Sequence, residues 1–355
     1  MTHRPTASIR PRALALGQDS GDELAALLGE EERDAWLAIP EVYHPEVVEL
    51  RGEHGVEAAL LVTHRPHTAY RKIARLRALN DAALDAAVAA LLDEARGRGG
   101  VASVKWEDAD GGAGAHALRN GFSPLPAPIP SGAGTAAAAG YVRYLDDWPH
   151  RSFPYYRQTT EYSCGPVALL MAQAGASDGG ITRAQELRIW RRAAHFPGCG
   201  PTGLAVHADL DVYRPEVEVS TSGPLLNEHL GDEVGLEVRA LVDADDEDRA
   251  AELGIPVRHR LTTVDEIAAH VSADRPVLLL IDELLLHGTA CAHWVLAHGY
   301  RDGFFLLHDP WIDAENGESW VDTHDLPIAA SDVDAITWWG DPAYRGVIVL
   351  HPASA

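Results

Sequence analysis

The stretch that decides the fold of this chain is TTEYSCGP, residues 159–166, followed by the apolar run 167–174. Ser163 is a residue type that caps helices, so the pattern predicts a buried helix that begins at Cys164. A thiol attacks as a thiolate, and the unpaired N–H groups at the start of a helix favour negative charge. Gly165 leaves room for a substrate to approach the sulfur. Cys164 is therefore the candidate nucleophile.

Gln158 lies six residues before this cysteine, in an extended segment. Its amide is placed to donate to an oxyanion beside the sulfur, with the backbone N–H of Cys164 as the second donor. Taken alone, Cys164 would be interpreted as an inert buried thiol, because free cysteine is often buried. Cys199 also precedes Gly-Pro but has an alanine six residues upstream, so it is interpreted as structural. Cys291 receives the same interpretation.

The partners of the thiol are expected on a hairpin formed by strands 293–300 and 304–308. A loop of three residues between them places Asp309 on the same face as His293, one diagonal step away. A loop of two residues would put these two side chains on opposite faces. In the first register, Asp309 holds the tautomer of His293, which acts as the general base and acid.

A zinc site is the alternative for part of this region, because His287, Cys291 and His293 are close in sequence. No second Cys/His pair stands at ligand spacing, so neither a metal nor another cofactor is expected. His298 and His308 are expected to point away from the catalytic face and to be structural.

The first half of the chain alternates strands and helices, which predicts a mixed α/β sheet. The predicted strands are residues 56–63, 72–79, 101–106 and 141–145, and the predicted helices are residues 24–37, 81–96 and 113–120. Asn80 is placed to cap the second of these helices. Residues 123–139 are rich in Pro, Ala, Gly and Ser, which predicts a flexible loop or an insertion. The pattern breaks at residues 146–150, so the domain boundary is predicted near residue 148.

The composition limits the classes of function. The chain has 355 residues, enough for two domains, and a formal net charge of −24. Such an acidic chain repels phosphate backbones and anionic lipid, so neither nucleic acid nor a membrane is an expected partner. The polar N-terminus holds no apolar signal core. Together with three sparse cysteines, this predicts a reduced, cytoplasmic protein without disulfides.

Residues 150–325 resemble the bacteriocin-leader-processing cysteine peptidases and their papain-like relatives. The resemblance rests on Gln158, on Cys164 with its following glycine and apolar helix, and on the later His293 and Asp309. It implies a papain-like fold, in which the helix that bears the cysteine packs on an antiparallel sheet. It also implies that the glutamine binds the oxyanion, the cysteine attacks, and the histidine and aspartate complete the catalytic set.

The run ALRNGF, residues 117–122, ends a strand-helix-strand pattern that resembles the end of GNAT-type N-acetyltransferases. This resemblance covers most of residues 10–145. The family holds the pyrophosphate of acetyl-CoA on a glycine-bearing turn that opens the central helix. Residues 76–83 stand at that place, contain no glycine and carry Asp81, which would repel phosphate. The first half is therefore interpreted as a degenerate domain that serves as a scaffold or substrate platform.

The sequence thus predicts an α+β protein with a degenerate GNAT-like domain at residues 1–147 and a papain-like cysteine peptidase domain at residues 148–355. The expected activity is hydrolysis of a peptide or amide bond through a thioester on Cys164. Two alternatives stay open, an acyltransferase that hands the same thioester to an amine and a binding protein without activity. The expected partner is a peptide or amide substrate, and the sequence does not determine the oligomeric state.

Overall fold

The computed structural model describes residues 8–13, 18–53, 55–109, 111–132, 138–148, 151–177, 179–195, 198–227 and 232–353. The chain divides into two compact units, and both are discontinuous in sequence. The first unit consists of residues 1–125, 137–147 and 313–322, and the second of residues 126–136, 148–312 and 323–355. The start of the chain and residues 133–137 of the predicted flexible loop lie outside the described residues.

The sheet of the first unit has the strand order β1-β2-β3-β4-β5-β7-β6. Among its described strands, β4 and β5 are parallel and the other neighbours are antiparallel, which confirms the predicted mixed sheet. The strands are β1 (Ser8–Ala13), β2 (Glu46–Gly52), β3 (Gly55–Thr63), β4 (Tyr70–Ala78), β5 (Ser103–Asp108), β6 (Ser123–Pro124) and β7 (Ala139–Tyr144). The four predicted strands correspond to β3, β4, β5 and β7.

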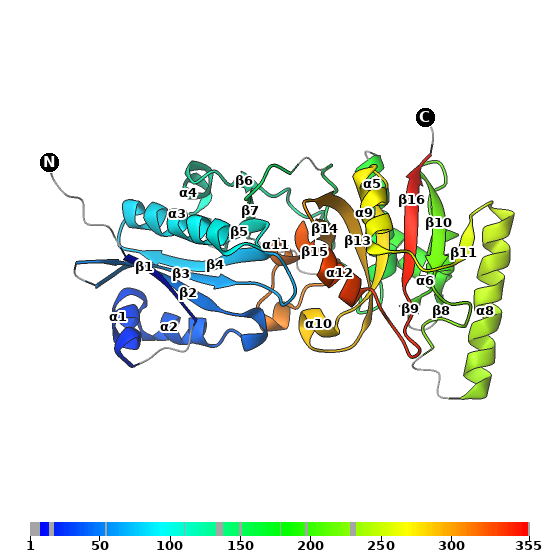
Figure 1. Ribbon diagram of the computed structural model, residues 1–355, viewed down its shortest axis with the longest axis horizontal. Helices are drawn as coiled ribbons and strands as arrows, with labels where there is room; N and C mark the ends of the chain where they lie inside the picture. Colours follow the sequence, from blue (N-terminus) through cyan, green and yellow to red (C-terminus); the bar gives the residue numbers. More distant parts are fainter. Residues whose placement is uncertain are drawn as a thin grey trace. The chain divides into compact units, whose positions relative to one another are not determined.

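Helices cover both faces of this sheet (Figure 1). They are α1 (Gln18–Leu28), α2 (Glu30–Leu37), η1 (Glu41–Tyr43), α3 (Asp81–Arg98), α4 (Gly114–Arg119), η2 (Ala314–Asn316) and α11 (Trp320–Thr323). The single helix predicted over residues 24–37 is wrong, because Gly29 adopts a φ of 83° and separates α1 from α2. Asn80 caps α3 as predicted, since its side chain accepts a hydrogen bond from the N–H of Ala83.

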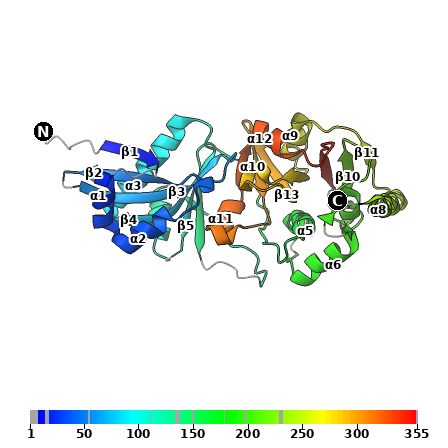
Figure 2. The ribbon, with the colours of Figure 1, turned by 90° about the horizontal axis from the view of Figure 1, so that it is seen from below.

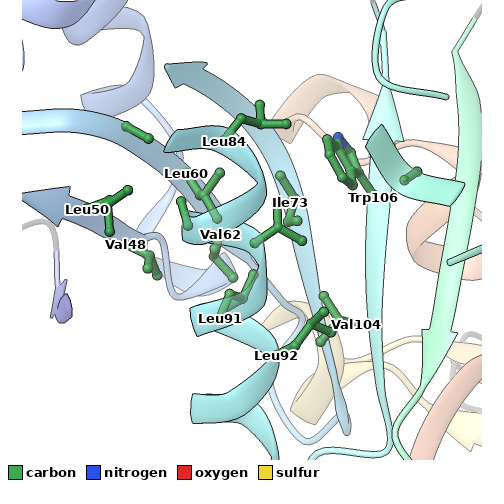
Figure 3. Packing of buried hydrophobic residues seen from close by; sticks show 14 of the residues in the cluster. Val48, Leu50, Leu60, Val62, Ile73, Leu84, Leu91, Leu92, Val104 and Trp106 are labelled. Carbon is green, nitrogen blue, oxygen red and sulfur yellow. The ribbon is translucent and has the colours of Figure 1, made fainter. Parts of the chain in front are cut away.

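Successive apolar residues along β3 point to opposite faces of the sheet and contribute to a core on each face. Ala58, Leu60 and Val62 pack with α3, and Figure 3 shows the leucines of that helix meeting the strands. Ala59 and Leu61 point to the opposite face, where the core includes residues of α1 and α2. A strand with both faces covered is apolar at successive positions, which is the pattern the sequence shows here.

The segment 313–322 joins the first unit through buried ion pairs, although it lies far along the chain. The Nζ of Lys72 is 2.5 Å from Oδ2 of Asp322, and both side chains are almost fully buried. The Nη2 of Arg65 donates to Oε2 of Glu318 over 2.6 Å, and this pair is also buried. Buried charges are costly unless they are paired, so these contacts make the segment part of the first unit.

The sheet of the second unit has the strand order β11-β10-β16-β12-β13-β14-β15. Its strands are β10 (Tyr213–Val219), β11 (Val257–His259), β12 (Val277–Asp282), β13 (Ala292–Arg301), β14 (Phe304–His308), β15 (Leu326–Ala329) and β16 (Gly346–Pro352). The pair β10–β11 is parallel and the remaining described pairs are antiparallel. A separate two-stranded sheet joins β8 (Ala194–His195) to β9 (Gly198–Cys199).

Helices also lie on both sides of this second sheet, with α5 and α6 on one side of β13 and α9 and α12 on the other (Figure 2). The helices of the unit are α5 (Cys164–Ala176), α6 (Arg183–Ala193), α7 (Pro201–Ala205), α8 (Glu233–Glu252), α9 (Val264–Ser272), α10 (Leu284–His287) and α12 (Ala330–Ile336). The helix that begins at Cys164 packs on β13. The predicted α+β class, with a cysteine-bearing helix on a largely antiparallel sheet, is therefore confirmed.

Candidate active site

Cys164 is the first residue of α5, as the sequence predicts. The residue is 8 % exposed and lines a pocket of about 180 Å³. Ser163 occupies the N-cap position, but its side chain makes no capping hydrogen bond and donates instead to Glu186 over 2.5 Å. The first N–H groups of α5 therefore keep the positive end of the helix dipole at the sulfur.

Gly165 is also constrained by packing. A β-carbon at this position would lie 2.7 Å from the side chain of Leu204 and 3.1 Å from that of Trp294. The start of α5 is therefore in close contact with these two side chains, and the room that the glycine leaves for a substrate stays a prediction.

The hairpin reaches the predicted pairing by a different route. Arg301 pairs with Phe304, so the loop is the two residues Asp302-Gly303, both with positive φ. The prediction of a three-residue loop is wrong, because this two-residue turn matches the twist of the strands. The register then shifts at a bulge, where His298 is the extra residue. Beyond the bulge Leu296 faces His308, which is the register that the longer loop would have produced.

The bulge brings His293 and Asp309 together. The Nε2 of His293 lies 2.8 Å from Oδ1 of Asp309, and the same oxygen accepts the backbone N–H of Trp311 over 2.8 Å. The backbone carbonyl of Asp309 accepts the hydroxyl of Tyr155 over 2.9 Å. Side chain and backbone of Asp309 are thus both held by hydrogen bonds, and the contact of Oδ1 with Nε2 leaves Nδ1 of the imidazole for another partner.

Glu283, which the sequence analysis did not select, is the second carboxylate at this imidazole. Its Oε1 lies 3.4 Å from Nε2 of His293. Burial acts to lower the pKa of His293, but the charges of Glu283, Asp309 and Cys164 outweigh it and hold this pKa well above its ordinary value. Cys164 lies in the same pocket as Ala292 and Trp294, the neighbours of His293 on β13. Glu283 directly follows the buried strand β12, which lies next to β13, and this position is the signal that could have identified it.

Gln158 lies on the extended segment before α5 and is buried. Its backbone N–H donates to the carbonyl of Pro310 over 2.9 Å, which ties it to the segment that follows Asp309. Its Nε2 donates to the carbonyl of Thr160 over 2.8 Å. An amide nitrogen carries two hydrogens, so one N–H remains beyond this contact.

A sequence model of the Peptidase_C39 like family matches residues 153–351, which is more than half of the chain. The chain belongs to the Peptidase_C39 like family. The matched residues include all four candidate site residues of this C39-like chain: Gln158, Cys164, His293 and Asp309. No curated protein sequence matches the chain.

Solved structures similar to this C39-like chain include several acetyltransferases. An aminoglycoside 6'-N-acetyltransferase from Enterococcus faecium is 11% identical, with 39% of this chain and 99% of that chain covered and a TM-score of 0.32. The ribosomal-protein-S18-alanine N-acetyltransferase from Escherichia coli is 15% identical, with 39% and 96% covered and a TM-score of 0.29. An acetyl transferase from Salmonella typhimurium that modifies the N-terminal serine of ribosomal protein L7/L12 is 16% identical, with 40% and 97% covered and a TM-score of 0.32.

Glu186 of the C39-like unit holds the loop that leads into the cysteine helix. This carboxylate is fully buried and accepts the backbone N–H of Thr159 over 2.7 Å. It also accepts hydrogen bonds from the hydroxyl groups of Tyr156 over 3.2 Å, Thr159 over 2.9 Å and Ser163 over 2.5 Å. Its only local feature in the sequence is a position in the first turn of α6, because its partners lie more than 20 residues upstream.

The pocket at the thiol of the C39-like unit is largely apolar. Side chains from five separate segments contribute to its wall, namely Tyr162, Leu226, Leu280, Trp294 and Trp339. Cys199 and Cys291 line the same pocket. Burial raises the pKa of Cys199, and burial with the charge of Glu283 raises that of Cys291, so neither thiol readily becomes a thiolate.

The metal ligands considered in the sequence of this C39-like chain do not form one group. Among the described residues, donor atoms of Glu283, His287 and Asp309 lie within 4.8 Å of one another, whereas Cys291 and His293 are not part of this group. Among the same residues, no helix combines the length and apolar character needed to cross a bilayer.

Proposed function

We propose that the chain is a cysteine-dependent hydrolase that cleaves a peptide or amide bond through a thioester on Cys164. The observation that carries the proposal is the buried pair of His293 and Asp309, whose Nε2 and Oδ1 are 2.8 Å apart. Ala292 and Trp294, the neighbours of His293 on β13, line the same pocket as Cys164, which begins a helix. The raised pKa of His293 favours an imidazolium, which can give a proton to a leaving amine.

In the proposed reaction the thiolate of Cys164 attacks the carbonyl carbon and forms a tetrahedral oxyanion. The backbone N–H of Cys164 and the remaining amide N–H of Gln158 stabilise this oxyanion. His293 gives its proton to the leaving amine as the C–N bond breaks, which produces a thioester. His293 then takes a proton from water, the hydroxide attacks the thioester, and a carboxylic acid leaves the regenerated cysteine.

The pocket indicates which substrates are favoured in this proposal. Tyr162, Trp294 and Trp339 give it aromatic walls, and its volume of about 180 Å³ limits the group it can hold. We expect a substrate with an apolar side chain next to the scissile bond, because burial of that side chain would drive binding. A cytoplasmic location and a peptide substrate stay predictions from the sequence.

The test begins with a variant that keeps Cys164 as the sole cysteine, with Cys199→Ser and Cys291→Ser. Iodoacetamide should label this protein near neutral pH faster than an ordinary thiol, and Asp309→Asn should slow the labelling. Glutathione under the same conditions reports the rate of an ordinary thiol. A rate for Cys164 no higher than that of glutathione would contradict the proposal.

Activity is measured on a library of fluorogenic peptides with an apolar residue before the reporter amide. We expect the full chain to hydrolyse some of them and Cys164→Ser to lose at least about a thousandfold in kcat/KM. Addition of a primary amine distinguishes the acyltransferase alternative, in which the acyl group would appear on the amine and not as a free acid. Hydrolysis that survives in Cys164→Ala would refute the proposed nucleophile.

A further inference from the structure

We infer that His298, His308 and Asp325 form a binding site for a zinc ion inside the second unit. The Nε2 of His298 lies 3.2 Å from Nδ1 of His308 and 3.3 Å from Oδ1 of Asp325. The third edge of this triangle, from Nδ1 of His308 to Oδ1 of Asp325, is 3.6 Å. All three residues are buried, and their donor atoms lie within 4.8 Å of one another.

These distances fit the coordination of zinc. Zinc binds nitrogen at about 2.0–2.1 Å and carboxylate oxygen at about 2.0–2.2 Å in a tetrahedral site, which puts neighbouring ligand atoms about 3.3 Å apart. The observed separations of 3.2, 3.3 and 3.6 Å need little adjustment to reach that value. Imidazole and carboxylate together favour zinc over magnesium or calcium, which prefer oxygen ligands.

A fourth donor lies beside Asp325, although it is outside the group of three. The Nε2 of His324, which is also buried, lies 3.9 Å from Oδ1 of Asp325. Its ring and that of His308 have centroids 4.7 Å apart. If His324 moved toward the other two imidazoles, three imidazoles and one carboxylate would close a tetrahedral site without water, as structural zinc sites do.

The second contact of His308 supports the ligand role of its Nδ1. The Nε2 of this ring faces the backbone carbonyl of Phe153 at 3.0 Å, so it carries the proton and Nδ1 presents a lone pair. The same Nδ1 accepts the backbone N–H of Asp325 over 3.2 Å. Zinc would replace this hydrogen bond from Asp325. The alternative is that the same side chains form a hydrogen-bonded network without a metal, and measurements of metal content distinguish the two.

The site would act on the catalytic hairpin. His298 is the bulge residue of β13, and His308 directly precedes Asp309 on β14. Thr323, next to His324, accepts the backbone N–H of Asp309 over 3.1 Å. A metal bound at these positions would hold the bulge that aligns His293 with Asp309. Zinc binding itself does not depend on whether Cys164 is a nucleophile.

The experiment uses the full chain without an affinity tag, stripped of metal and then given zinc or cobalt(II). We expect about one zinc ion to remain per chain after dialysis and the melting temperature to rise when zinc is added. Cobalt(II) should give the absorption of a tetrahedral site without the charge-transfer band of a thiolate ligand. A chain that retains no metal and shows no change in melting temperature would refute the site.

Variants locate the metal. His298→Gln and Asp325→Asn should each weaken zinc binding at least about tenfold. His287→Ala, in the other group of donors, and His270→Ala, on α9, are controls that should keep it. Zinc that persists in the first two variants and is lost in His287→Ala would overturn the assignment. If these variants do not fold, X-ray absorption of the zinc-loaded wild type decides, because imidazole shells support the site and sulfur shells refute it.

Discussion

His293 is surrounded by more negative charge than a single orienting aspartate would supply. Asp309 is hydrogen-bonded to its Nε2, and Glu283 lies 3.4 Å from the same nitrogen. Both carboxylates stabilise the imidazolium and oppose the effect of burial, so the pKa of His293 is raised. Because both carboxylates lie near the same nitrogen, each of them contributes to the raised pKa of His293.

Removal of either charge should move the pH at which His293 loses its proton. Because its pKa is raised, His293 stays protonated above pH 6.5 and loses its proton as the pH rises through its pKa in the folded protein. In Glu283→Gln and in Asp309→Asn one contribution that raises the pKa is gone, so the loss should occur at lower pH. An NMR titration of the His293 ring measures this directly, and the alkaline limb of kcat/KM should follow it.

The control for this titration is Glu237→Gln, which removes a carboxylate from the exposed surface of α8. It should leave the titration of His293 unchanged. An unchanged or higher pKa in Glu283→Gln would show that this carboxylate does not stabilise the imidazolium.

The residues that the sequence made visible are those with a local signature. Cys164 has a helix start and a glutamine six residues upstream, and Asp309 follows a strand that pairs with that of His293. Glu186 has no such signature, and the position of Glu283 after a buried strand relates it to His293 only once β12 pairs with β13. Contacts between segments that are distant in the chain produce no local spacing pattern in the sequence.

At the scale of elements, the hairpin has the predicted register near His293 and Asp309, although its loop has two residues and not the predicted three. The Asp302-Gly303 turn fixes one register, and the extra residue His298 restores the other. The histidine at position 298 does not reveal a bulge in the sequence, so the loop length alone predicts the wrong register for the residues beyond it. Helix α8 was also missed, because its side chains are mostly exposed and show no apolar stripe.

The loop between Gln158 and Cys164 depends on another element, helix α6. Glu186 accepts hydrogen bonds from Thr159 and Ser163, on either side of that loop. We expect Glu186→Ala to lower kcat about tenfold or more while KM changes little, because the oxyanion donors lose their position and the pocket wall does not. Steady-state kinetics on the best library peptide measures the two constants separately.

Glu186→Gln keeps the shape of the side chain and one acceptor oxygen, so it should restore part of the lost kcat. Glu237→Ala, a matched truncation on an exposed helix face, should leave both constants unchanged. A loss of stability in Glu186→Ala with normal kcat in the folded fraction would show that Glu186 has no positioning role.

At the scale of the whole molecule, the first unit is not contained in the first 147 residues. Segment 313–322 contributes Glu318 and Asp322, which pair with buried Arg65 and Lys72. The Nζ of Lys105 donates to the carbonyls of Val321 and Asp322 over 2.8 and 2.9 Å. A boundary near residue 148 remains a prediction from composition, which cannot reveal that a later segment returns to neutralise these cations.

Expression of residues 1–147 alone tests this dependence. The truncated chain would bury Arg65 without Glu318 and would leave Lys72 with Glu107 but without Asp322. An unpaired buried ion costs several kcal/mol, so we expect the fragment not to unfold cooperatively. In the full chain, Lys72→Met leaves Asp322 buried beside the hydroxyl of Tyr70 and should destabilise the first unit by about 3 to 5 kcal/mol. Arg96→Met, at an exposed ion pair, should cost at most about 1 kcal/mol. Denaturant unfolding measures all three, and a stable 1–147 fragment would mean that segment 313–322 is dispensable for the fold of this unit.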